Sequence, residues 1–308
     1  MDPKGKYKSR ISSYFTPENI DIYNEPVELD TLVYKLLENL ALNYGIGNIK
    51  NLYEQQYLTV YKKIPIEVCD TCQLFHFRIT STDDPRIAIS VVKNGIVNNN
   101  ESKTKIILVT TSPKHTPDVY LKIRKAFKFL LCDQRNSETI FKAKNGQEIW
   151  DLIDRTNLTF PDVILAEDVM QKVLVKLEET QTLKDAIDLI VTSGIMSIPV
   201  VDLEGNLVGE VTSKELMEVC LPRYILWVND ITPIVNFEPF QNMLEHEDST
   251  WLAEIMHYGC ATIQEDEPFM KAAVAMTKKS VKHVYVLNNR NLRGVITLHF
   301  FLKKILRE

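Results

Sequence analysis

Long apolar runs are missing from this chain of 308 residues. No segment approaches the ~18 apolar residues of a membrane-spanning helix, and the first ten residues, MDPKGKYKSR, lack the apolar stretch of a secretory signal. Both absences favour a cytoplasmic protein without membrane insertion. Cysteine is also scarce, and because the five thiols are an odd number and thinly spread, we expect no disulfide framework.

Strong charge of one sign is absent overall, but the net charge of −5 hides an asymmetry. Residues 1–157 carry a net charge of +3, and the remaining residues carry −8. Neither half has a basic stripe interleaved with aromatic residues, and the acidic half would repel a phosphate backbone. We therefore expect no nucleic acid partner. The hydrophobic fraction of 45% is ample for a core in each of two domains.

A repeat is present in the second half of the chain, where residues 166–216 and 252–301 share one pattern. The offset between matching residues is 86 before the central turn and 85 after it, which one deletion in the turn explains. Matching positions include Met170 with Met256, Ala186 with Ala272, Gly209 with Gly294, and Thr212 with Thr297.

Each copy predicts a short strand, an amphipathic helix, an apolar strand, a turn, a second strand and a closing helix. In the first copy the apolar strand is Ile198–Val201, the turn is Asp202–Gly205, and the second strand begins at Leu207. Gly205 suits a turn that needs a positive φ. One β-α-β-β-α unit is too small to bury its sheet, so we expect the two copies to pack together as an α+β domain.

The repeat resembles the CBS domain family, in which tandem copies pair into a Bateman module. The resemblance rests on the Asp168-Val-Met170 start, the Ile198-Pro-Val-Val-Asp202 strand and the Gly-x-Val-Thr-x-x-Glu end. It implies a CBS pair over residues 158–308 and a homodimer formed through that pair.

The same resemblance implies clefts for an adenosine-type ligand: AMP, ADP or ATP, or else S-adenosylmethionine or cyclic di-AMP. The family's threonine bonds the sugar or phosphate, and a carboxylate three residues later accepts both ribose hydroxyls, a suitable role for an acceptor-only group. The first repeat has Thr212 and Glu215, with glutamate in place of the usual aspartate. The second repeat has Thr297 but Phe300 at the carboxylate position.

Further ligand contacts are expected from Ser197 and Lys282, which complete the predicted binding set. Lys282, His283 and Arg293 could face the phosphates of a ligand, and ordinary surface charge is the alternative interpretation. Between the repeats, residues 221–250 are rich in aromatics and contain three prolines. Their apolar content favours a docking segment over a loose linker.

The first half alternates helical and strand patterns over residues 14–155. Residues 27–45 predict a helix that ends at Gly45, and residues 104–113 are nearly all apolar and predict a central strand. Another strand is expected within residues 85–96. Two further helical stretches follow at 118–133 and 137–154, the second broken at Asn145-Gly146. The class expected for this domain is α/β with a mixed sheet.

This order resembles the IIA domain of the fructose and nitrogen-regulatory branch of the bacterial sugar phosphotransferase system, over residues 1–157. The matching stretches are YFTPENI (14–20), PRIAISVVKNGI (85–96) and residues 106–130. Counting back from Pro85 places His76-Phe77-Arg78 on the family's His-Ala-Arg. The resemblance implies that His76 accepts a phosphoryl group from a histidine-containing carrier protein, while the Arg78 fork neutralises the phosphoryl oxygens.

The chain departs from that family at two points. The glycine-rich turn before the histidine is replaced by EVCDTCQLF, which has no glycine, and Tyr120 stands where the family has a second histidine. His115 lies five residues earlier and is the alternative partner. The predicted domain is therefore a degenerate IIA domain.

Two thiols and the histidine also form the pattern Cys69-x2-Cys72-x3-His76. A structural zinc site needs four ligands and no second pair follows, so we expect no metal. A redox Cys-x-x-Cys belongs at the start of a helix, whereas residues 73–79 predict a strand. Reduced thiols on a core strand are the favoured interpretation.

The sequence thus favours a cytoplasmic regulatory protein, in which ligand binding at the Thr212/Glu215 cleft changes the packing of the repeats and of residues 221–250. This change would alter what the IIA-like domain presents to a transporter or regulator. One alternative is an active phosphocarrier using His76, and another is an interaction scaffold without a ligand. The question of enzymatic activity stays open, with a regulatory role favoured.

Overall fold

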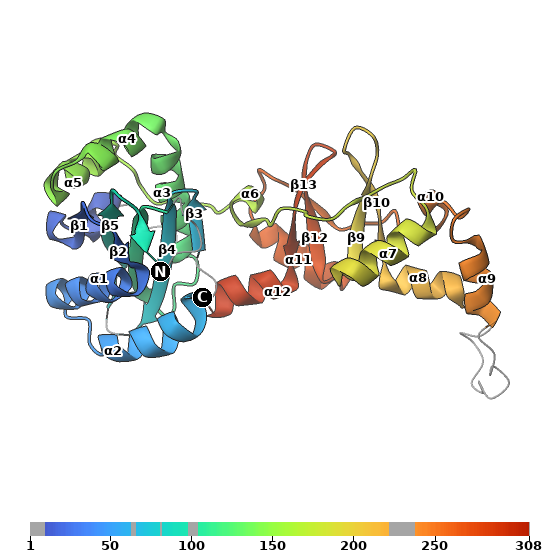
Figure 1. The fold of residues 1–308 in the computed structure, drawn as a ribbon, viewed down its shortest axis with the longest axis horizontal. Coiled ribbons are helices and arrows are strands. Elements are labelled where there is room, and N and C mark those ends of the chain that lie inside the picture. The colour runs from blue at the N-terminus through green and yellow to red at the C-terminus, as the bar shows by residue number, and fades with distance from the viewer. Residues whose placement is uncertain (1–9, 63–65, 81, 98–103, 222–237, 308) are drawn as a thin grey trace. The chain divides into compact units, whose positions relative to one another are not determined.

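The computed structural model describes residues 10–62, 66–80, 82–97, 104–221 and 238–307. The chain divides into two compact units (Figure 1): Met1–Ile164 together with Leu302–Glu308 form the first, and Leu165–Phe301 form the second. The sequence pattern does not predict that the last residues of the chain group with the first unit.

A five-stranded sheet organises the first unit, with strand order β1-β5-β7-β4-β3. β1 runs parallel to β5 and β4 parallel to β7, whereas β5 and β3 run antiparallel to β7 and β4. The sheet is therefore mixed, and the apolar strand β7 lies at its centre, as its composition predicts. The bounds are β1 Ile20–Tyr23, β3 Ile66–Cys69, β4 Cys72–Ile79, β5 Arg86–Val92 and β7 Ile106–Pro113.

Helices cover both faces of this sheet. Helix α1, Leu29–Tyr44, packs on one face and ends at Gly45, whose φ of 67° places it in the left-handed region that glycine tolerates. The expected break in the third helical stretch is confirmed, because Asn145 caps a new helix by accepting the backbone N–H of Glu148 at 3.0 Å. The helices on the other face are α3 Val119–Cys132, α4 Gln134–Lys142 and α5 Gly146–Arg155.

Shorter elements complete the first unit. They are η2 Ile11–Tyr14, η3 Pro17–Asn19, α2 Ile49–Leu52, the π-helical η4 Tyr53–Tyr61, the parallel pair β2 Val27–Glu28 and β6 Ile96–Val97, and η6 Leu302–Arg307 near the end of the chain.

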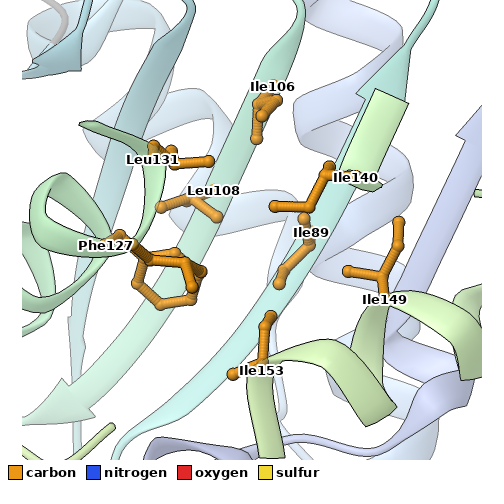
Figure 2. A pocket seen from close by; sticks show the side chains of 9 residues that line it. Ile89, Ile106, Leu108, Phe127, Leu131, Ile140, Ile149 and Ile153 are labelled. Carbon is orange, nitrogen blue, oxygen red and sulfur yellow. The ribbon is translucent and has the colours of Figure 1, made fainter. Parts of the chain in front are cut away.

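Alternate residues of the central strands point to opposite faces of the sheet and pack into two separate core layers. Ile107 and Val109 face the layer that contains α1, while Leu108 faces α3, α4 and α5. Figure 2 shows Leu108 and Ile89 opposite the isoleucines of α4 and α5, around a cavity of about 10 Å³ with a wholly apolar lining. Ligand pockets are at least about 300 Å³, so this space is a packing gap in the core and no binding site.

The second unit consists of two copies of one small motif, as the repeat predicts. Each copy has a three-stranded sheet in which the outer strands flank β9 or β12. Gly205 has a φ of 83° in the turn between β9 and β10, which confirms the expected positive φ. The first copy has α6 Ala166–Val169, β8 Leu177–Glu178, α7 Leu183–Ser193, β9 Ser197–Val201, β10 Leu207–Thr212 and α8 Ser213–Cys220; the second has α10 Leu252–Ile255, β11 Thr262–Gln264, α11 Met270–Lys279, β12 His283–Asn288, β13 Asn291–Thr297 and α12 Leu298–Phe301.

The two copies are joined by a reciprocal exchange of backbone pairing. The segment after α6 bridges to the second copy, where Gln171 and Val295 exchange N–H···O bonds of 2.9 Å. The segment after α10 bridges to the first copy, where Glu210 and His257 exchange bonds of 3.0 and 2.8 Å. Each copy thus adds backbone to the sheet of the other.

Two matched glycines permit this close approach. A Cβ atom at Gly294 would lie 2.7 Å from the carbonyl oxygen of Gln171 and 2.8 Å from the sulfur of Met170. A Cβ atom at Gly209 would lie 2.8 Å from the sulfur of Met256. The Met and Gly positions that match within the repeat therefore meet across it, each methionine against the glycine of the other copy.

The segment between the repeats is described in part. Residues 222–237 of the predicted docking segment lie outside the described residues. Most of the remainder forms α9, Glu238–His246, whose Met243 packs against the core of the first copy. Within the described parts of the chain, no helix combines the length and apolarity needed to cross a membrane.

Candidate functional site

A polar cluster lies at the junction of the two copies, centred on the Glu210 carboxylate of β10. One oxygen, Oε2, accepts hydrogen bonds from His283 Nε2 at 2.7 Å, from Ser197 Oγ at 2.9 Å and from Tyr285 OH at 3.0 Å. The Ser197 hydroxyl also lies 3.3 Å from His283 Nε2 and from Tyr285 OH. First-copy residues Ser197 and Glu210 thus form one network with second-copy residues His283 and Tyr285.

The cluster is largely shielded from water, since Glu210 is 6% exposed and Tyr285 2%. Burial raises the pKa of Glu210, but the bonds from His283, Ser197 and Tyr285 outweigh it and hold the pKa below its usual range. Burial, followed by the charge of Glu210, raises the pKa of Tyr285. The arrangement is therefore an ionised carboxylate satisfied by neighbouring donors.

Thr212 and Glu215 lie together at the start of α8, where they form a capping box. The Thr212 N–H donates to Glu215 Oε2 at 3.1 Å, and the Thr212 hydroxyl donates to the same oxygen. In return, Thr212 Oγ1 accepts from the backbone N–H of Lys214 at 3.2 Å. Both side chains are half-buried, so they remain within reach of a bound molecule.

The second copy lacks the corresponding carboxylate. Thr297 Oγ1 accepts the backbone N–H of Phe300 at 3.1 Å, which caps the closing helix α12 without an acidic partner. Lys282 precedes β12 and is exposed. The strand register places two predicted ligand residues, Ser197 and Thr212, opposite each other. It places Thr297 opposite His283, which follows Lys282 in sequence.

His76 lies in the middle of β4, with no exposed surface. Its Nδ1 is 2.8 Å from Thr110 Oγ1 and its Nε2 is 3.0 Å from Ser112 Oγ, both on β7. The ring of Tyr120 lies beside it, with centroids 5.5 Å apart. Both imidazole nitrogens are thus engaged, and a phosphoryl donor would have no path to either of them in this conformation.

The electrostatics of His76 agree with this placement. Burial, and then the neighbouring Arg78 guanidinium, lower the pKa of His76 to about 3. Arg78 itself is half-buried, and its Nη2 donates to the carbonyl oxygen of Ile305 at 3.0 Å. The predicted phosphoryl acceptor His76 is therefore bonded to buried hydroxyls of β7, and the predicted supporting residue Arg78 is bonded to the backbone of Ile305. His115, the alternative partner, is exposed in the loop after β7.

Cys69 and Cys72 face each other across the turn between β3 and β4, and both are free thiols. Burial raises the pKa of the Cys72 thiol well above its usual value, which leaves it protonated and unreactive. Among the residues that the structure describes, no group of three or more His, Cys, Asp and Glu side chains could hold a metal ion.

Glu210 and Tyr285 are the site residues that sequence reasoning missed. The available signal was an acidic residue inside the otherwise apolar strand Leu207-Val-Gly-Glu-Val, two positions before the predicted Thr212. Tyr285 occupies the position that matches Pro199 in the other repeat, inside an apolar strand, so the repeat pattern does not mark it as a site residue.

Comparison with known proteins matches the CBS domain family to residues 166–221 and 252–305. The C-terminal half therefore carries a pair of CBS domains. An uncharacterized protein of Methanopyrus kandleri is 36% identical over 59 residues, which are 19% of this chain and 30% of that protein. The chain thus matches less than a third of the length of that relative.

Among solved structures, the CBS domain of a membrane protein from Sphaerobacter thermophilus is similar at 20% identity, covering 47% of this chain and 90% of that one, with a TM-score of 0.38. CBSX2 in complex with AMP is similar at 16% identity, covering 46% of this chain and 96% of that one, with a TM-score of 0.36.

Proposed function

We propose that this protein is a regulatory protein whose CBS pair binds an adenosine-type ligand beside Thr212 and Glu215 and thereby modulates the N-terminal unit. CBS domains are commonly nucleotide-sensing regulatory modules, and the observation that carries the proposal here is the Thr212–Glu215 capping box next to the inter-repeat cluster. A carboxylate can accept about four hydrogen bonds, so Glu215 keeps capacity for a ribose diol while it caps α8.

The closing helix supplies a route to the N-terminal unit. Thr297 caps α12, Leu298–Phe301, which continues directly in sequence into η6, Leu302–Arg307. The carbonyl oxygen of Ile305 in η6 accepts the bond from Arg78. A ligand beside Thr212 would act on this helix through Glu210 and His283, because His283 is bonded to Glu210 and is the strand partner of Thr297.

The single experiment is a thermal shift of the full chain with adenosine, AMP, ATP, S-adenosylmethionine and cyclic di-AMP. A ligand at 100 times its Kd should stabilise the second unit by about 2.7 kcal/mol. Glu215→Gln should abolish this shift, while Glu218→Gln, an exposed carboxylate one turn later on α8, should keep it.

If none of the five compounds shifts the melting curve, the proposal fails and the scaffold without a ligand becomes the better description. A homodimer through the CBS pair is part of the proposal and follows from the family resemblance.

The phosphocarrier alternative draws no support from the surroundings of His76. A phosphoryl acceptor needs an accessible ring nitrogen within reach of its donor, and both nitrogens of His76 are buried against Thr110 and Ser112. A IIA-like domain at residues 1–157 remains a prediction from the sequence.

A further inference from the structure

Glu210 lies on the same face of β10 as Thr212, since residues two apart on a strand point to one side. In the strand register, Thr212 is opposite Ser197 and Thr297 is opposite His283. Each of the two threonines is therefore next to a side chain that is already bonded to the Glu210 carboxylate.

The hydrogen-bond donors of the polar cluster point to a carboxylate of the protein itself, that of Glu210. The hydroxyls of Ser197 and Tyr285 and the Nε2–H of His283 converge on Glu210 Oε2. These O–H and N–H groups are the kind that could otherwise bind a ligand phosphate. With a neutral imidazole the cluster carries one negative charge, and with an imidazolium the two charges cancel. In either case no positive charge remains for a phosphate.

The surrounding ionisable groups do not reverse this balance. Burial, and next the charge of Glu210, raise the pKa of the Cys260 thiol to about 12. The thiol therefore stays neutral and adds no charge to the cluster. The Lys279 ammonium donates to the carbonyl oxygen of Cys260 at 3.4 Å and is exposed. Lys282 directly precedes β12 and is exposed.

We propose that Glu210 makes the proposed ligand site beside Thr212 and Glu215 selective for adenosine derivatives that carry no phosphate, such as adenosine itself or the cationic S-adenosylmethionine, and selective against AMP and ATP. The inference rests on the proposed function and specifies its ligand class. With a neutral His283, a ligand charge placed at an assumed separation of about 7 Å from the carboxylate, at an effective dielectric constant of about 20, changes affinity by about 50-fold. A phosphate at neutral pH carries more than one charge.

The test is isothermal titration calorimetry of the full chain with adenosine, AMP, ATP and S-adenosylmethionine. The wild-type protein should bind adenosine at least about 50-fold more tightly than AMP. Glu210→Gln, which keeps the size and removes the charge, should reduce that ratio to near one. The matched control Glu218→Gln removes an exposed carboxylate of the same repeat and should keep the wild-type ratio.

A further variant separates charge from hydrogen bonding. His283→Leu deletes one donor but keeps the Glu210 carboxylate, so it should retain selectivity against phosphate. Equal or tighter binding of AMP by the wild-type protein overturns the inference, as does an unchanged ratio in a folded Glu210→Gln. The wild-type ratio alone decides the matter if that variant does not fold. Absence of binding by all four compounds overturns the proposed function instead.

Discussion

Acidification should destabilise the N-terminal unit through one residue, His76. Its pKa is about 3 in the folded protein, against a usual value near 6.5. Between these two values the unfolded chain binds a proton that the folded chain does not, so stability is highest above pH 6.5 and falls as the pH drops towards 3. Between pH 7 and pH 5 this linkage costs about 2 kcal/mol.

Urea unfolding at pH 7 and pH 5 measures the effect. With a slope of roughly 2 kcal/mol/M for a unit of this size, 2 kcal/mol lowers the midpoint by about 1 M. Trp150 is the only tryptophan of the N-terminal unit, so replacing Trp227 and Trp251 by phenylalanine makes fluorescence specific for that unit. Carboxylates that also titrate in this range affect wild type and variant equally, and the comparison between proteins removes their contribution.

His76→Gln keeps an amide that can bond Thr110 or Ser112, and it has no proton to gain. The midpoint of this variant should therefore fall by about 1 M less than that of the wild type between the two pH values. His115→Gln changes an exposed histidine of the same unit and should behave as wild type. If His76→Gln loses as much stability on acidification as the wild type, the imidazole is not held neutral in the folded protein and the buried-core description of β4 is wrong.

Two shorter predictions concern the exchange between repeats and the phosphocarrier alternative. Gly294→Ala should lower the stability of the second unit by roughly 1–3 kcal/mol, because the new Cβ meets the backbone oxygen of Gln171. The control Gly47→Ala has open space around it and should not destabilise the protein through crowding. Equal unfolding midpoints of Gly294→Ala and the wild type would contradict the close approach. Incubation with a phosphorylated histidine carrier protein should give no base-stable, acid-labile phosphate adduct on the full chain, and mass spectrometry showing one that disappears in His76→Ala would restore the carrier hypothesis.

Local order could be predicted from sequence where a short pattern determines it. The helix end at Gly45, the break before Gly146 and the turn at Gly205 each depend on the conformational preferences of one or two residues, and all three were expected. The central place of β7 follows from its continuous apolar composition, because only a strand covered on both faces can bury every side chain.

The remainder depends on contacts that sequence spacing does not encode. His76 fits a family motif by position, yet its function depends on the two hydroxyls that a parallel neighbour strand brings to its ring. Glu210 belongs to a network that needs side chains from both repeats, and a pattern read within one repeat cannot show it. The grouping of Leu302–Glu308 with the first unit is a tertiary event without a local signal.

The reciprocal pairing of the repeats also bears on how the second unit folds. Gln171 finds its partner Val295 across 124 positions of chain, and no shorter loop completes that part of the sheet. A ribosome must therefore release almost the whole second unit before this pairing can form, whereas Glu210 and His257, on opposite repeats too, are much closer in sequence. Until Val295 is present, the backbone at Gln171 lacks its partner strand, so products truncated before β13 should be prone to aggregate rather than to persist as partial modules.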